Sequence, residues 1–142
     1  MDIPADEARA LFAAARVARL GTVGADGLPH LVPVTFAVEG DAVFFAVDAK
    51  PKRAQRLRRL RNIAENPHVS LLVDEYDEDW SRLWWVRADG VARVHRTADA
   101  PAGVYGLLRA RYPQYDDVDV AAGPLVEIAV RRWTGWRLAS GG

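Results

Sequence analysis

The sequence has no cysteine and only three histidines, His30, His68 and His95, among its 142 residues. The lack of cysteine excludes disulfides, thiol nucleophiles, iron–sulfur clusters and zinc ribbons. Because the histidines are scattered without the spacing of metal ligands, we expect no metal site. The 19 basic residues are balanced by 19 acidic ones. A net charge of zero argues against a general binder of nucleic acids or membrane surfaces.

Long hydrophobic runs are also missing. No stretch of about 18 apolar residues occurs, so we expect no membrane-spanning segment. The first ten residues, MDIPADEARA, are acidic and amphipathic, unlike a signal peptide. A length of 142 residues fits one domain. We therefore predict a single cytoplasmic domain that spans residues 1–142.

Short alternating apolar segments, separated by turn residues, predict a mainly β fold with three short peripheral helices. Pro29 and Pro33 share one phase of the second predicted strand, which places part of that strand at a sheet edge. Asp89-Gly90 lies inside another predicted strand and is interpreted as a turn, bulge or bend. Six or seven antiparallel strands usually curl into a barrel, which is the predicted architecture. The predicted helices cover 4–16, 52–64 and 98–112, and the predicted strands cover 17–23, 28–38, 42–47, 68–74, 82–96, 124–131 and 133–139.

One segment concentrates positive charge. Residues 50–61 contain seven basic residues and no acid, although the whole chain is neutral. A helix N-terminus carries partial positive charge and disfavours cations, so a predicted helix that starts with Lys52 and Arg53 needs a partner. A bound anion, held by backbone N–H groups and cationic side chains together, would resolve the conflict. The seven residues are Lys50, Lys52, Arg53, Arg56, Arg58, Arg59 and Arg61.

The helical phase divides these cations into two groups. The predicted apolar stripe consists of Leu57, Leu60 and Ala64. Arg53 lies on the side of this stripe, toward the core. The other predicted group points to solvent and comprises Arg58, Arg59 and Arg61. For these three residues, a solvated basic face without a bound anion is an equally good interpretation.

The neighbouring strand suggests which anion would bind. Pro33, Val34, Thr35 and Phe36 offer an apolar wall, a hydroxyl group and a proline that leaves a sheet edge open. An apolar strand edge beside a phosphate grip suits a flat, phosphorylated ring cofactor.

Three motifs resemble the pyridoxamine 5′-phosphate oxidase-like split β-barrel family. They are FAVDAKPKR at 45–53, GxPHxxPVxF at 27–36 and NPHVSLLVD at 66–74. They are similar to the actinobacterial branch, which includes reductases that use the deazaflavin coenzyme F420. The resemblance implies an FMN-binding split-barrel fold and a homodimer with a cofactor groove between its protomers.

The resemblance also implies site residues. The phosphate would be held by Lys50, Lys52 and Arg53, with Arg56 possible, and Pro51 stands where the family has serine. The added lysines suit the longer anionic tail of F420 at least as well as the simple phosphate of FMN, and a preference for F420 is our hypothesis. The ring would lie against the set Pro33, Val34, Thr35, Phe36, Ala46 and Val47.

The resulting hypothesis is an F420-dependent oxidoreductase that transfers a hydride between reduced F420 and a small organic acceptor. The alternatives are an FMN-binding oxidoreductase of the same fold and a non-enzymatic protein that binds F420 or a tetrapyrrole. Trp80, Trp84 and His30 are candidates for a substrate pocket, with core or interface packing as the alternative interpretation. No catalytic residue is predicted.

Overall fold

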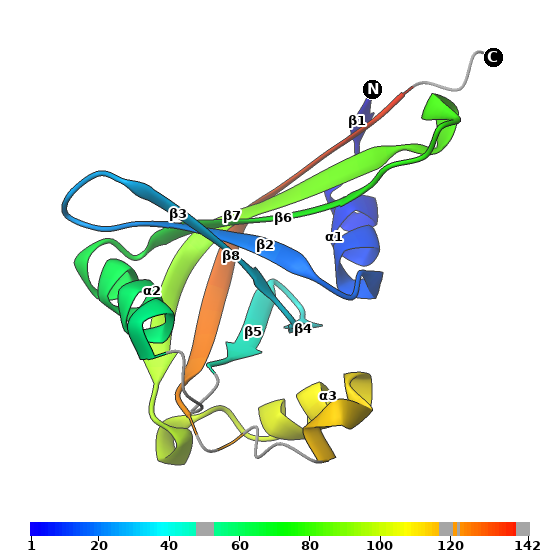
Figure 1. Cartoon of the computed structure of the whole chain (residues 1–142). Helices are drawn as coiled ribbons and strands as arrows, with labels where there is room; N and C mark the ends of the chain where they lie inside the picture. The colour runs from blue at the N-terminus through cyan, green and yellow to red at the C-terminus, as the bar shows by residue number, and fades with distance from the viewer. Residues whose placement is uncertain (48–52, 117–120, 122, 139–142) are drawn as a thin grey trace.

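The computed structural model describes residues 1–47, 53–116, 121 and 123–138, with only the backbone described for 53–57 and 116. In this part of the chain, eight strands and three α-helices surround one main core (Figure 1). The helices are α1 (Ala5–Ala14), α2 (Arg53–Glu65) and α3 (Val104–Arg111). No described helix is long and apolar enough to cross a membrane. The strands are β1 (Asp2–Ile3), β2 (Ala18–Val23), β3 (Pro29–Val34), β4 (Ala37–Glu39), β5 (Ala42–Ala46), β6 (His68–Glu75), β7 (Trp84–His95) and β8 (Leu125–Arg137).

All strand pairs are antiparallel, and the sheet runs in the order β3-β2-β6-β7-β8-β5-β4, with β1 added to β8. The sheet curls around its core but stays open, because β3 and β4 form its two ends. This confirms the predicted split-barrel class. It also confirms the predicted edge position of Pro29 and Pro33, because both lie in β3.

Three predicted boundaries were wrong. The strand predicted for 28–38 divides into β3 and β4, and the Tyr112 hydroxyl bonds the N–H and the carbonyl of Phe36 at the break, at 3.1 and 3.0 Å. The two closing strands predicted for 124–139 are one strand, β8, since β7 pairs with it throughout. The helix predicted from residue 98 begins at Val104, after a short 3-10 turn at Thr97–Asp99.

A bulge keeps β7 continuous. The register between β7 and β8 shifts at Asp89/Gly90, so this dipeptide is a bulge rather than a hairpin turn. Glycine is required there, because a Cβ on Gly90 would lie 2.4 Å from the carbonyl oxygen of Ala129.

The main core lies inside the curled sheet. Phe12 of α1 and Ile63 of α2 pack there against strand residues such as Leu20, Phe45 and Ile128. A smaller cluster lies between α3 and the β4, β5 and β8 region, where Leu108 and Tyr112 meet Phe44 and Leu125. Each helix is therefore fixed to the sheet by its own buried residues.

Candidate functional site

The inward face of α2 matches the predicted stripe only in part. Leu60 packs against the main core as predicted, whereas the side chain of Leu57 is outside the described set. Asn62 and Ile63 are 2% and 3% exposed, whereas Ala64 is exposed. Residues three and four positions apart share a helix face, so Arg59 lies on the same inward face as Asn62 and Ile63. The prediction that Arg59 points to solvent was therefore wrong.

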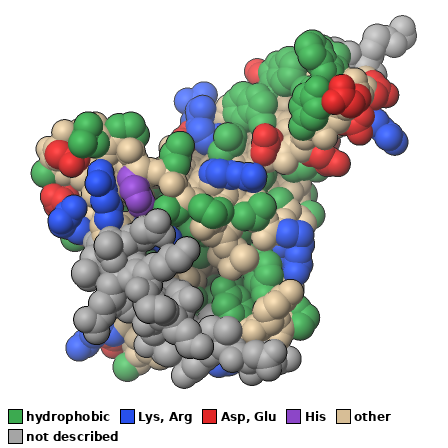
Figure 2. Space-filling view, in the orientation of Figure 1, with side chains coloured by type: hydrophobic (Ala, Val, Ile, Leu, Met, Phe, Trp, Pro, Cys, Tyr) green, Lys and Arg blue, Asp and Glu red, His purple; other side chains and the backbone are tan. Residues whose placement is uncertain are grey.

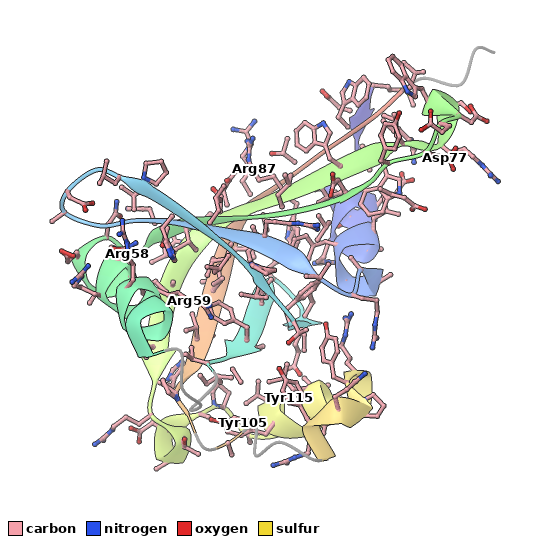
Figure 3. All side chains as sticks on the ribbon, in the orientation of Figure 1. Arg58, Arg59, Asp77, Arg87, Tyr105 and Tyr115 are labelled. Atoms are coloured by element: carbon pink, nitrogen blue, oxygen red, sulfur yellow. The ribbon has the colours of Figure 1, made fainter. Side chains whose placement is uncertain are left out.

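The other two arginines of that group differ from each other. Arg58 is half-buried and lies on the side of α2 that faces the β2–β3 hairpin (Figure 3). The Arg61 side chain is 66% exposed and lies 3.9 Å from the Glu65 carboxylate, so Arg61 faces solvent as predicted.

Close packing against the β2–β3 hairpin fixes this face of α2. Asn62 donates a hydrogen bond from Nδ2 to Thr22 Oγ1 at 3.1 Å, and both residues are buried. Glu65 accepts one from the backbone N–H of Ala25 at 3.4 Å. A Cβ on Gly24 would lie 2.5 Å from Asn62 Oδ1, so this approach needs glycine. The helix therefore holds its inward side chains in a fixed place.

His30 faces α2 from the opposite side. It pairs with the buried Thr22 across β2 and β3. Directly paired residues project from the same face of a sheet, so His30 lies on the inner face beside α2. Its ring is half-buried, and Nδ1 is shielded from solvent.

Three nitrogen atoms of α2 and β3 are shielded from solvent and have no hydrogen-bond partner among the described residues. They are His30 Nδ1, Arg58 Nε and Arg59 Nε. Arg58 forms a long ion pair, with its Nη2 4.0 Å from the Asp26 carboxylate. The Arg59 guanidinium lies 5.9 Å from the centre of the Phe45 ring. We call His30, Arg58 and Arg59 the basic corner.

The electrostatics show that these positive charges are poorly compensated. Burial lowers the pKa of the Arg59 guanidinium. Burial, followed by the charges of Arg58 and then Arg59, lowers the pKa of His30 below its ordinary value of 6.5. Buried polar groups normally have partners, and each one that lacks a partner needs a physical explanation. A phosphate would supply acceptors for all three nitrogens and negative charge for both arginines.

The predicted phosphate grip lies earlier in the chain than this corner. Lys50, Pro51 and Lys52 are outside the described residues. Arg53 and Arg56 belong to α2, but their side chains are also outside the described set. The prediction for these five residues stays open. The basic corner was not predicted, although the alternation of β2 and β3 could have placed His30 on the inner face.

Only some residues of the predicted ring wall are accessible to a ligand. Pro33 and Thr35 are exposed, and the Thr35 hydroxyl is 2.8 Å from the Tyr115 hydroxyl. Ala46 is half-buried. The side chains of Val34, Phe36 and Val47 are 6%, 0% and 2% exposed and fill the core. These three residues are almost fully buried and offer a ligand little surface, and both backbone polar groups of Phe36 already bond Tyr112.

The three substrate-pocket candidates do not come together within this chain. Trp80 lies in a 3-10 turn (Trp80–Arg82) between β6 and β7, and Trp84 begins β7. This end of the hairpin lies far from α2 and from the basic corner (Figure 1). Trp80 is 62% exposed, and Trp84 donates from Nε1 to Glu75 at 3.1 Å. His30 alone is near the predicted cofactor region.

The outer face of the sheet carries two grooves. One of about 580 Å³ runs between Pro29, His68 and Val91. The other, of about 520 Å³, runs between Leu31, Leu72 and Trp85. Gly21 and Ser70 border both grooves, so they form one continuous surface. Leu31 is 72% exposed and Leu72 is 38% exposed, which makes this surface partly apolar.

Comparison with known proteins identifies the family. The pyridoxamine 5′-phosphate oxidase family matches residues 4–137. The chain belongs to this family. A 5a,11a-dehydrotetracycline/5a,11a-dehydrooxytetracycline reductase from Streptomyces rimosus is 39% identical over 57 residues. That stretch is 40% of this chain and 39% of the reductase, so the chain matches well under half of that relative.

Two solved structures show the same fold. A FAD-binding protein from Mesorhizobium loti has a TM-score of 0.70 and 20% identity, and the match covers 95% of each chain. An F420 reductase has a TM-score of 0.62 and 22% identity, over 88% of this chain and 94% of that one. The family fold is thus shown over almost the whole chain.

Proposed function

We propose that this member of the pyridoxamine 5′-phosphate oxidase family is an oxidoreductase that binds a phosphorylated flavin-type cofactor, coenzyme F420 in preference to FMN. The observation that carries the proposal is the basic corner, where three shielded nitrogens lack partners in the described part of the chain. Similarity to a tetracycline-type reductase and to an F420 reductase supports the reaction class.

The residues of the corner fit a phosphate group. Arg58 and Arg59 each carry a shielded Nε–H without a partner among the described residues. A phosphate could accept from such donors, and charge-assisted hydrogen bonds of this kind are short and strong. Phe45 is fully buried and supports the Arg59 guanidinium through a cation–π contact. The arginines are thus held in place before a ligand arrives, which lowers the entropic cost of binding.

The earlier cations extend the same surface in this proposal. Lys50, Lys52, Arg53 and Arg56 precede the basic corner along the chain and would contact the remaining negative charges of a longer cofactor. This arrangement favours F420, whose anionic tail is longer than the phosphate end of FMN. FMN is the alternative ligand.

The chemistry comes from the cofactor, which when bound supplies a hydride to an organic acceptor. The protein contributes binding and orientation. Pro33 and Thr35 present exposed side chains beside the break between β3 and β4, and Ala46 ends β5. These residues would border the ring, while the corner fixes the phosphate and so sets the ring's position.

We also propose that the functional unit is a homodimer. The outer face of β3, β2 and β6 exposes Leu31 and Leu72 beside two continuous grooves. Exposed apolar surface of this kind marks interaction sites. A second copy on this face would bury these leucines and the grooves beside them.

The dimer is tested by the substitution Leu31→Glu, which places a charge on this surface. We expect sedimentation velocity to show a shift from dimer to monomer. Leu107 of α3 is 37% exposed and lies away from the outer face, so Leu107→Glu is the matched control. A Leu31→Glu protein that stays as dimeric as the control would reject this interface.

The cofactor is tested by titrating the purified protein with F420 and with FMN under the same conditions. We expect F420 to bind more tightly. The double variant Arg58→Ala/Arg59→Ala should lose at least about 100-fold in affinity, because each charge-assisted hydrogen bond is worth about 1.5–3 kcal/mol. The exposed Arg61→Ala serves as the control on the same helix. Binding of neither cofactor, or equal affinity of the double variant and the control, would overturn the proposal.

A further inference from the structure

His30 differs from the two arginines of the basic corner because its charge can change near neutral pH. Its Nδ1 is shielded and lacks a partner among the described residues. On β2, its paired neighbour is the neutral Thr22, whose hydroxyl accepts from Asn62. The charged groups that face it from α2 are Arg58 and Arg59.

The nearby acids offset these charges only weakly. Asp26, in the β2–β3 turn, accepts from the N–H of Leu28 at 3.0 Å and lies 4.0 Å from Arg58. Glu65, at the end of α2, accepts from Ala25 and lies 3.9 Å from Arg61. Asp26 thus reaches only Arg58 among the corner residues, and Glu65 is paired with Arg61. No hydrogen bond or ion pair joins His30 to an acid in the described part of the chain.

The protonation state of His30 follows from this environment. Without a ligand, burial and the two arginines favour the neutral imidazole. A phosphate in the corner would offset the charges of the two arginines. It would also offer His30 Nδ1 a hydrogen-bond acceptor. Both changes stabilise the imidazolium.

We propose that His30 is the third phosphate-binding residue and that it takes up a proton when the phosphate enters. The inference rests on the proposed function and adds to it that the phosphorylated ligand and a proton bind together. The phosphate thus meets three positive donors, although the empty corner holds only two. The protein avoids a third unpaired charge until a ligand is present.

The sign of the pH dependence follows from linkage. The pKa of His30 lies below its usual value in the empty corner and rises when phosphate binds. Ligand affinity is therefore highest at acidic pH and falls as pH rises through the interval between the two pKa values. One linked proton gives a slope of up to tenfold in affinity per pH unit within that interval.

The experiment is isothermal titration calorimetry with F420 and FMN at pH 7, in two buffers of different ionisation enthalpy. The difference in heat gives the number of protons taken up. We expect the wild type to take up more protons than His30→Gln with the same ligand, which cancels any titration of the ligand itself. Arg61→Ala is the control, because Arg61 faces solvent on α2 and the variant keeps His30, so its proton number should equal that of the wild type.

The outcomes separate the two claims. If neither ligand binds, or if Arg58→Ala/Arg59→Ala binds like the wild type, the proposed function fails. If binding requires the arginines but His30→Gln takes up as many protons as the wild type, only the inference about His30 fails. Should His30→Gln not fold, an NMR titration of the His30 ring in the wild type decides, and an unchanged pKa on binding would overturn the inference.

Discussion

The basic corner and the hairpin end between β6 and β7 are both dense in charge of one sign, yet their charges are placed differently. We call residues 75–81 the acidic tip; it contains Glu75, Asp77, Glu78 and Asp79. Red acidic and green hydrophobic side chains gather at this end of the molecule (Figure 2). In Figure 1 the tip lies at the upper right, whereas α2, which carries two residues of the corner, lies at the left.

The acids of the tip have local partners. Asp77 accepts from the N–H of Asp79 at 2.7 Å, and Asp79 accepts from the N–H and hydroxyl of Ser81 at 3.1 and 2.7 Å. These are short-range bonds that stabilise a turn. Asp79 remains exposed and Asp77 is half-buried. In the corner, by contrast, shielded nitrogens have no partner among the described residues. The number of like charges therefore does not identify a ligand site, whereas the hydrogen-bond partners of each charge do.

The largest expected effect comes from the contact that positions the corner. Gly24→Ala would place a Cβ 2.5 Å from Asn62 Oδ1, in a buried contact that fixes α2. We expect a loss of about 1–3 kcal/mol in the free energy of unfolding, together with weaker cofactor binding. Chemical denaturation and cofactor titration measure the two effects.

The matched control is Gly106→Ala in α3, where a Cβ would meet nothing within 4 Å. This change should leave stability unchanged or raise it, because alanine favours a helix more than glycine does. If Gly24→Ala and Gly106→Ala behave alike, the close packing of α2 on the β2–β3 hairpin does not support the corner.

A smaller effect of opposite sign is expected from Arg59→Met. Methionine keeps much of the side-chain volume and removes a shielded donor that lacks a partner in the described structure. Without cofactor, we expect a gain of about 1 kcal/mol in the free energy of unfolding. With cofactor, the stabilisation that a ligand normally gives should be reduced. Thermal unfolding with and without F420 measures both, and a destabilised protein that still gains full cofactor protection would contradict the account.

The smallest effect is expected at the tip. Asp79→Ala removes two bonds to Ser81, so we expect a slightly lower Tm at neutral pH and unchanged cofactor affinity. The Ser81 hydroxyl and then its N–H hold the pKa of Asp79 below 3.8. A lowered pKa stabilises the fold above the ordinary value, and this contribution disappears as pH falls through the lower folded value. The difference in Tm from the wild type should therefore vanish in strong acid. A large loss of cofactor affinity would show that the tip belongs to the binding site.

The sequence was a good guide where local pattern decides structure. Alternation located most of the strands, and the prolines of β3 indicated an edge. It was a poor guide where contacts between segments far apart in the sequence decide the structure. The break at Phe36 depends on Tyr112, which lies 76 residues later in the chain. Whether Asp89-Gly90 formed a turn or a bulge depended on pairing with β8.

The same limit explains why the basic corner was not predicted from the sequence. The helical wheel of α2 treated leucine and alanine as the buried stripe, but the buried polar Asn62 and its bond to Thr22 set the actual phase. Arginine has a long apolar stem, so Arg59 can cross the inward face and pack over Phe45. Sequence analysis singled out α2, the helix that carries two residues of the basic corner. It could not show which of seven cations lack a partner, because that depends on neighbours from β2, β3 and β5.

The most direct test is a crystal structure of the protein with bound F420. The account predicts that the phosphate lies within hydrogen-bonding distance of Arg58 Nε, Arg59 Nε and His30 Nδ1. A phosphate held only by the cations at 50–53, with no ligand atom in the basic corner, would contradict it.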